Sequence, residues 1–189
     1  MEKPTLIIIT GRPGSGKSTL AHLIAREIRC PLISRDEIKE GYINTINTAH
    51  NKITPEENKK IYDLFFNAIV LFLDNKITII AEAAFQHKLW FPKYEILQQK
   101  SNIKLIICKI DPKIAGARYL ERKNKNPLRE YFHGDPPPSP ENNVYDPPKL
   151  PVPSLEVDTA DEYKPGLDEI KRFIQSPGDD TADIKFETN

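Results

Sequence analysis

Apolar runs alternate with amphipathic stretches along the chain. The runs at 6–9, 77–81 and 104–110 are continuous, as in strands buried on both faces of a parallel sheet, and 32–33 and 154–157 are shorter candidates. In the intervening segments apolar residues recur at helical spacing, over 20–28, 61–72, 89–99, 114–123 and 165–174. Such alternation predicts right-handed βαβ units. We therefore expect an α/β protein with three α/β/α layers and a five-stranded parallel sheet.

Two prolines fall at expected helix starts. Thr54, Pro55 and Glu57 combine an N-cap hydroxyl, a proline at the first helical position and an acid three residues after the cap. This pattern predicts that a helix begins at Pro55. Pro92 must lie in the first turn of the helix over 89–99, because proline in a helix interior removes a backbone hydrogen bond.

The length of 189 residues favours one domain. We assign residues 1–175 to this domain and the polar, acidic residues 176–189 to a frayed tail. Eight of the 17 prolines lie between residues 136 and 153. This Pro-rich loop, over 133–153, is either an ordered extended loop near an active site or a flexible excursion.

Composition narrows the class of protein only slightly. Basic and acidic residues balance at 27 each, which argues against a strongly basic nucleic-acid binder but leaves room for a local basic channel. Cys30 and Cys108 lie beside apolar runs, so we expect buried thiols rather than a disulfide or a metal site. The apolar stretch near the N-terminus is too short for a signal peptide or a membrane span, and a cytoplasmic protein is the default expectation.

The strongest motif follows the first apolar run. It has the Walker A spacing of a glycine, four residues and Gly-Lys-Ser, and with the next threonine it comprises Gly11, Arg12, Pro13, Gly14, Ser15, Gly16, Lys17, Ser18 and Thr19. Glycines let backbone N–H groups approach phosphates, and the helix that follows directs its positive end at the anion. Lys17 is expected to reach the β- and γ-phosphates, and the Ser18 hydroxyl is expected to ligate Mg²⁺. The sequence therefore predicts a nucleoside-triphosphate site.

The rest of the chain indicates which nucleotide binds. A GTPase would carry an Asn-Lys-x-Asp guanine reader, and the four Asn-Lys pairs have Thr54, Ile61, Thr78 and Pro127 in place of the aspartate. A transporter-type ATPase would carry a Ser-Gly-Gly signature, which is absent. These absences favour ATP and a small kinase.

Four segments, in order, resemble one group of proteins: 11–19, Ser34-Arg35-Asp36, Glu82-Ala83-Ala84-Phe85, and the stretch from Asp111 to Arg122. Over about residues 5–174 the chain resembles the phosphate-loop kinases of the group that includes AAA-type ATPases, polynucleotide kinases, chloramphenicol phosphotransferase and zeta-type toxins. The resemblance implies a kinase-like fold of the P-loop nucleoside triphosphate hydrolase class.

In such kinases an acid after the second strand accepts the proton of the substrate hydroxyl, and Asp36 matches that position. Asp36 is alternatively the N-cap of a helix over 37–42. Arg35 either contacts an anionic substrate or is a solvated surface residue.

The resemblance also implies an acid that holds the water shell of Mg²⁺. For this role we favour Glu82, which follows the third strand. Asp111, which also ends an apolar strand, is the other candidate and is more readily explained as a helix cap.

The resemblance also implies a lid over about 118–132. Arg118 and Arg122 are one helical turn apart and would clamp phosphates, although a basic, solvated helix end is the alternative. His133-Gly134-Asp135 is similar to a short motif after the lid, for which we favour a loop turn. The loop at Asp158-Thr159 would contact adenine through its backbone.

Together these features predict an ATP- and Mg²⁺-dependent kinase that acts on a hydroxyl. The acceptor is either a small molecule or a nucleic-acid 5′ end, and the chain is expected to be a monomer or a homodimer without a membrane contact. The alternative is a P-loop ATPase or an ATP-binding regulatory protein with no acceptor.

Overall fold

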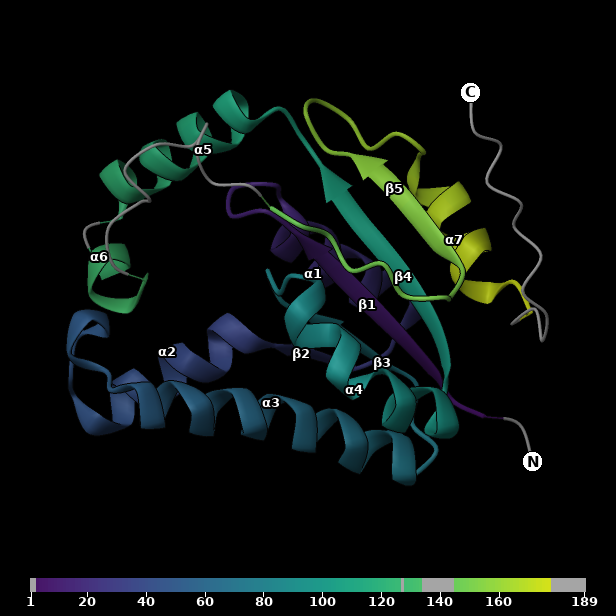
Figure 1. Ribbon diagram of the computed structural model, residues 1–189. Helices are drawn as coiled ribbons and strands as arrows, with labels where there is room; N and C mark the ends of the chain where they lie inside the picture. Colours follow the sequence, from purple (N-terminus) through teal and green to yellow (C-terminus); the bar gives the residue numbers. More distant parts are fainter. Residues whose placement is uncertain (1–2, 127, 134–144, 178–189) are drawn as a thin grey trace.

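The computed structural model describes residues 3–126, 128–133 and 145–177, and Figure 1 shows their arrangement. Five parallel strands form one sheet in the order β2-β3-β1-β4-β5. They are β1 (Thr5–Gly11), β2 (Leu32–Ser34), β3 (Ile79–Glu82), β4 (Asn102–Lys109) and β5 (Ser154–Asp158). The predicted five-stranded parallel sheet is confirmed.

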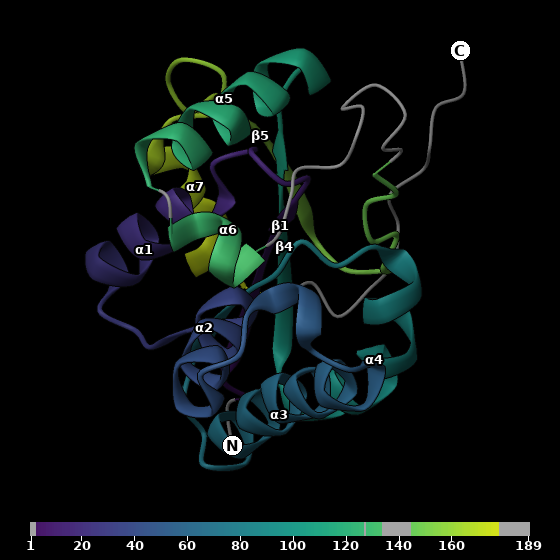
Figure 2. The ribbon, with the colours of Figure 1, turned by 90° about the vertical axis from the view of Figure 1, so that its left-hand side faces the viewer.

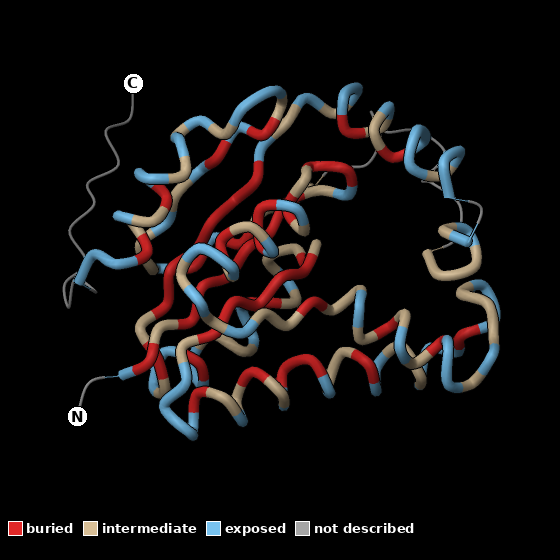
Figure 3. The backbone as a smooth tube through the Cα atoms, turned by 180° about the vertical axis from the view of Figure 1, so that it is seen from behind, coloured by how far each residue is buried: buried red, intermediate tan, exposed pale blue. Residues whose placement is uncertain are grey.

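Helices cover both faces of the sheet. They are α1 (Lys17–Ile28), α2 (Arg35–Ile46), α3 (Pro55–Asp74), α4 (His87–Lys100), α5 (Pro112–Lys125), α6 (Leu128–His133) and α7 (Leu167–Gln175), with a 3-10 turn, η1 (His50–Lys52). On β1, Leu6 and Ile8 pack into the core that includes α3 and α4, while Ile7 and Ile9 pack into the core that includes α1 and α7. Strands β1, β3 and β4 are largely buried, as their red traces in Figure 3 show, whereas β2 and β5 at the two edges of the sheet are more exposed.

Strand β1 lies where the chain changes direction across the sheet. From β1 the chain goes to β2 at one edge and returns to β3, and it then crosses to β4 and β5 on the other side. In open α/β sheets ligands bind outside the carboxyl ends of the strands at such a switch point. The segment after β1 is the predicted phosphate loop, so the topology of the sheet and the sequence motif indicate the same ligand site.

One helix start matches its signal and another differs from the expectation. Thr54 accepts from the Glu57 N–H and the Glu57 carboxylate accepts from the Thr54 N–H, which completes the predicted capping box of α3. Pro92, however, is inside α4 rather than in its first turn. The helix begins earlier than expected, at His87, whose N–H donates to the Asp146 carbonyl. That contact joins residues far apart in sequence and is not visible in the local pattern.

The described part of the Pro-rich loop, residues 145–153, is an ordered extended segment, which is the first of the two predicted possibilities. The Tyr145 and Thr10 hydroxyls are 2.7 Å apart, Leu150 is buried in the core, and Pro153 accepts from the Leu105 N–H. The segment is thereby fixed beside the carboxyl end of β1. The rest of the loop, at 134–144, and the tail at 178–189 lie outside the described residues, as do Gly134 and Asp135.

In the described part of the chain no helix combines the length and apolarity that crossing a membrane requires.

Candidate active site

The phosphate loop, residues 11–18, makes a tight turn between β1 and α1. Gly14 has φ +86°, and a Cβ there would lie 2.3 Å from the Ala115 carbonyl oxygen on α5. Gly16 has φ +76° and is the N-cap of α1. Both positions need glycine, because L side chains rarely adopt these backbone angles. The N-terminal end of α1 is therefore free to face an anion.

Three polar side chains converge on Glu82 at the end of β3. Lys17 Nζ is 3.4 Å from Glu82 Oε1, and the Ser18 hydroxyl donates to the same oxygen over 3.3 Å. The Ser34 hydroxyl, at the end of β2, donates to Glu82 Oε2 over 2.7 Å. Lys17 is 7% exposed and Glu82 is 1% exposed, so this ion pair is buried. Strand pairing aligns Ile9 with Glu82 and Ser34 with Glu82, which explains why the three strand ends meet.

These side chains fit a nucleotide with a divalent cation. The Ser18 hydroxyl and the Glu82 carboxylate are hard oxygen donors of the kind Mg²⁺ prefers. The Ser15 hydroxyl is buried and has no hydrogen-bond partner among the described residues, as expected of a donor that faces a phosphate. No group of three or more His, Cys, Asp or Glu residues suited to a metal occurs in the described ranges. Mg²⁺ in proteins usually keeps several waters and shares its ligands with substrate phosphates, so Ser18 and Glu82 would supply part of its coordination.

Asp111, the rival of Glu82, caps a helix. Its carboxylate accepts from the Lys113 N–H over 2.8 Å at the start of α5. A cap satisfies a helix N–H group that has no intrahelical partner, which is a sufficient structural role. The structure thus brings Glu82, and not Asp111, into contact with Lys17 and Ser18.

Asp36 does not cap a helix, and that alternative is wrong. Helix α2 begins at Arg35 with Ser34 as its N-cap, so Asp36 lies inside the first turn. Its carboxylate accepts from Arg35 Nη1 over 3.2 Å. Burial works against the charged form, but the charges of Lys17, Arg35 and His133 lower the pKa of Asp36 below its usual value. Asp36 is therefore an ionised carboxylate that is electrostatically coupled to the phosphate-loop lysine.

Arg118 is oriented by the loop after β5. Its guanidinium donates to the Thr159 carbonyl over 2.8 Å and also to the Ala160 carbonyl. The Thr159 hydroxyl donates to the Ser15 carbonyl over 2.6 Å, which connects this loop to the phosphate loop. A Cβ on Gly16 would lie 4.0 Å from Arg118 Nη1. Arg118 is thus beside the phosphate loop, held by carbonyl groups rather than solvated.

Arg122 lies one turn further along α5, where its Nε donates to the Arg118 carbonyl over 3.2 Å. Burial, followed by the charges of Arg129 and Arg118, lowers the pKa of Arg122. These arginines are close enough to repel one another. An anion bound between them would relieve that repulsion. Arg122 itself is exposed, so the phosphate clamp and the solvated helix end both fit this geometry.

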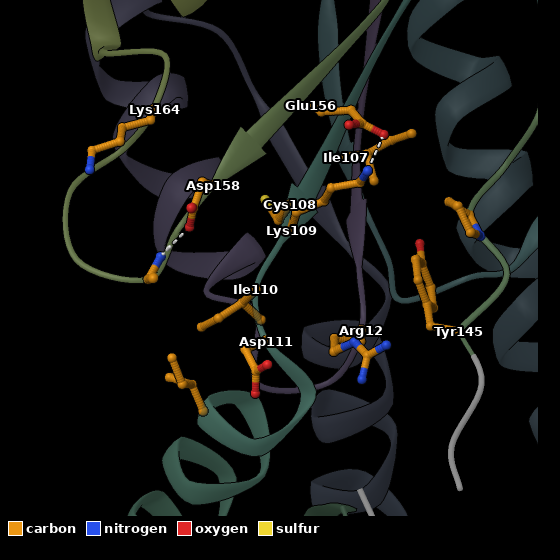
Figure 4. Close-up of a pocket in the computed structure, with 13 residues that line it drawn as sticks. Arg12, Ile107, Cys108, Lys109, Ile110, Asp111, Tyr145, Glu156, Asp158 and Lys164 are labelled. Carbon is orange, nitrogen blue, oxygen red and sulfur yellow. Dashed lines mark hydrogen bonds and ion pairs between the residues drawn. The ribbon is translucent and has the colours of Figure 1, made fainter. Parts of the chain in front are cut away.

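A cavity of about 670 Å³ lies beyond the phosphate loop at the carboxyl ends of β4 and β5. Figure 4 shows Arg12 and Tyr145 on one side of it and Asp158 and Lys164 on the other. Burial raises the pKa of the Tyr145 phenol to about 12, so this wall carries a neutral hydroxyl. Sequence reasoning missed Tyr145, whose contact with Thr10 spans most of the chain.

Of the two thiols, Cys108 lines the cavity at the carboxyl ends of β4 and β5, and Cys30 does not. Cys108 is buried, and Cys30, which we expected to be buried as well, is half-buried. Burial raises the pKa of Cys30 to about 11 and that of Cys108 to about 12. Both are free cysteines, in agreement with the expectation of no disulfide.

A second polar group, on α2 and α6, was also missed. Lys39 is 3% exposed and donates to His50 Nδ1 in η1. His133, for which we expected a loop turn, is the last residue of α6, and its Nε2 lies 2.7 Å from Glu40 Oε1. The spacing of Lys39 from Arg35, one helical turn, could have indicated Lys39. The sequence holds no corresponding signal for the two histidines.

Lys39 gives a prediction about stability and pH. Burial and the charge of Arg35 lower its pKa from 10.5 to about 8, against the opposing effect of Asp36. Between pH 8 and pH 10.5 the Lys39 amine is mostly neutral in the folded protein but protonated in the unfolded chain. The unfolded chain therefore binds more protons than the folded protein, and the free energy of unfolding should rise with pH from about 8 to 10.5. In urea titrations Lys39→Met should be more stable than wild type by about 1–2 kcal/mol at pH 7, with a smaller difference at high pH. A constant difference across this pH range would contradict the assignment.

Comparison with known proteins agrees with the fold and the loop. Residues 6–134 match the model of a family described as AAA domain, which is more than half of the chain. The chain therefore belongs to this family of AAA-domain proteins. No match was found among curated proteins.

Solved structures show the same fold. A Chloroflexus aurantiacus protein, provisionally assigned as a kinase, is 24% identical, with a TM-score of 0.73 over 85% of this chain and 88% of that chain. Mycobacterium tuberculosis APS kinase CysC, solved with AMPPNP and APS, is 15% identical, with a TM-score of 0.63 over 93% and 100%. A chain of the Pnkp1/Rnl/Hen1 RNA repair complex is 20% identical, with a TM-score of 0.58 over 73% of this chain and 41% of that chain. The expected likeness in fold to phosphate-loop kinases is confirmed.

Proposed function

We propose that the protein is an ATP-dependent kinase that transfers the γ-phosphoryl group to a hydroxyl of an acceptor. The observation that supports this proposal is the contact of Lys17 and Ser18 with Glu82 at the phosphate loop, with the Asp36 carboxylate in the first turn of α2, directly after the neighbouring strand β2. A nucleotide-binding switch needs the first three residues but has no need of Asp36. Phosphoryl transfer needs both sets, because a carboxylate must lie within reach of the attacking hydroxyl.

Each residue has a distinct role in this proposal. Lys17 and the N–H groups of residues 11–18 hold the β- and γ-phosphates. Ser18 and Glu82 hold Mg²⁺ directly or through water, and Mg²⁺ when bound neutralises charge that develops on the transferred group. Asp36 orients the acceptor hydroxyl and takes its proton as the new O–P bond forms.

The region of 118–132 acts as the lid in the same proposal. Arg118 and Arg122 stabilise negative charge on the phosphates, and Arg118 also positions the loop at Thr159 and Ala160. The nucleoside is expected to occupy the cavity at the carboxyl ends of β4 and β5, which adjoins both Arg12 and Ala160.

The proposal is tested by measuring ATP consumption with and without acceptors. Nucleosides, 5′-hydroxyl oligonucleotides, sugars and hydroxylated antibiotics are supplied singly with Mg²⁺ and ATP, and products are identified by mass spectrometry. At least one acceptor should raise ATP consumption about tenfold or more above hydrolysis and should gain one phosphoryl group. Slow hydrolysis that no acceptor changes would instead indicate an ATPase or a regulatory ATP-binding protein.

A further inference from the structure

Basic side chains from three elements gather beside Asp36. We define them as the basic cluster: Arg35 and Lys39 on α2, His50 on η1, and Arg129 and His133 on α6. Helix α6 packs against both η1 and α2, as Figures 1 and 2 show, so residues almost a hundred positions apart become neighbours. The cluster adjoins Asp36, the residue that we propose orients the acceptor hydroxyl.

Lys39 is the buried centre of this cluster. Its amine is hydrogen-bonded to an imidazole nitrogen, and it lies within electrostatic range of the Arg35 cation and the Asp36 carboxylate. Burial, followed by the charge of Lys39, lowers the pKa of His50, so this partner is a neutral acceptor. A buried ammonium whose hydrogen-bond partner is neutral is costly to the fold. An anion bound beside it would remove part of that cost.

Both arginines of the basic cluster have a buried N–H donor without a hydrogen-bond partner among the described residues. Arg35 uses Nη1 for Asp36 and Nη2 for Asn58, at 3.5 Å, and its Nε is buried without a hydrogen-bond partner in the described ranges. Arg129 Nε is likewise buried without a hydrogen-bond partner in the described ranges. The Arg129 guanidinium carbon lies over the Tyr119 ring, 5.2 Å from its centroid. Buried N–H groups are normally satisfied. Such donors, held in a planar fork, suit the oxygens of a phosphate or carboxylate.

The local charge count points the same way. Arg35, Lys39 and Arg129 supply three cations against the two carboxylates of Asp36 and Glu40. Glu40 contacts His133, whose pKa is lowered chiefly by burial, and Asp36 contacts Arg35. The neighbourhood therefore has a surplus of positive charge, although the whole chain is neutral.

We propose that the basic cluster binds an anionic group of the acceptor, a phosphate or a carboxylate, and so places the acceptor hydroxyl beside Asp36. This inference rests on the proposed kinase function for its role, but anion binding itself can be measured without turnover. It makes the acceptor an anionic molecule rather than a neutral sugar or nucleoside. Because Arg129 is on α6, the site is complete only when α6 lies against α2.

The test uses the full chain with its phosphate loop saturated by Mg²⁺ and a non-hydrolysable ATP analogue. Inorganic phosphate, sulfate or acetate is then added at constant ionic strength, and the melting temperature is measured. Phosphate should raise the melting temperature of wild type by about 3 °C at a concentration ten times its Kd. A response to phosphate and sulfate but not to acetate would assign a phosphate-bearing acceptor, and the reverse would assign a carboxylate.

Variants connect the response to the cluster. Lys39→Met, which should fold at least as stably as wild type, and Arg35→Gln, which changes a half-buried side chain, should each lose most of the shift. Lys52→Met is the matched control, because Lys52 is an exposed lysine in η1 and should keep the full shift. No anion shift in wild type, or an equal shift in folded Lys39→Met, would overturn the inference. Kinase activity without anion binding would overturn the inference alone, and anion binding without any phosphorylated acceptor would overturn the proposed function alone.

Discussion

Lys17→Ala is expected to lower ATP turnover by about 10³-fold or more, because a fixed cation at the transferred phosphate stabilises charge in the transition state. The same change removes the cation paired with buried Glu82 at 3.4 Å. Leaving a buried carboxylate without its partner should cost about 3 kcal/mol of stability in the nucleotide-free protein. Steady-state kinetics and urea unfolding measure the two effects separately.

The double variant Lys17→Ala with Glu82→Gln separates catalysis from folding. Since it removes both charges, it should recover most of the lost stability while remaining inactive. Lys59→Ala is a control for loss of a lysine, because Lys59 is 74% exposed and pairs with Asp63 on α3. A folded Lys17→Ala protein with turnover within tenfold of wild type would refute the role of Lys17.

Asp36→Asn is expected to slow phosphoryl transfer by about 10²- to 10⁴-fold, the usual contribution of a positioned base. Nucleotide affinity should change by no more than about threefold, because Asp36 is placed on the acceptor side. The pKa of Asp36 is lowered, so the wild-type carboxylate should be ionised at every pH above the usual range of an aspartate. Consequently Asp36 should cause no loss of activity as pH falls from 8 to about 5.

Glu37→Gln is the matched control for Asp36→Asn. Glu37 is the next residue of α2, and its carboxylate contacts His22 at 2.7 Å on the exposed side of the helix. It should retain wild-type transfer. Equal losses in both variants would show that the helix, and not the Asp36 carboxylate, was disturbed, and full transfer by Asp36→Asn would remove Asp36 as the base.

The sequence predicted the parts of the fold that depend on local pattern. Alternating burial of Ile7 and Ile8 on opposite faces follows from a strand between two helical layers, and the glycine spacing of the phosphate loop follows from its tight turn. Glu82 was preferred to Asp111 because the resemblance to phosphate-loop kinases places the third strand beside the first, and β3 does pair with β1. Outside the phosphate loop, the site prediction therefore depended mostly on the family resemblance.

Contacts between distant segments escaped prediction. The start of α4 at His87 depends on the Asp146 carbonyl, and the packing of α6 on α2 depends on His133 and Glu40. Arg118 was placed on the correct helix, but its carbonyl partners at Thr159 and Ala160 come from beyond the Pro-rich loop. The spacing of Lys39 from Arg35 could have indicated a shared helix face, but not that η1 and α6 pack over α2 and that Lys39 is buried. These features arise from tertiary packing, which no local period encodes.

The most direct measurement of the central claim follows the terminal phosphoryl group of ATP. The full chain is incubated with Mg²⁺, ATP carrying ¹⁸O in the γ-phosphoryl group and a pool of hydroxyl acceptors, and the label is located by mass spectrometry. The kinase proposal predicts that the label leaves ATP into an organic phosphate ester and that Asp36→Asn suppresses this product. Recovery of all the label as inorganic phosphate, at a rate that the acceptors and Asp36→Asn leave unchanged, would contradict it.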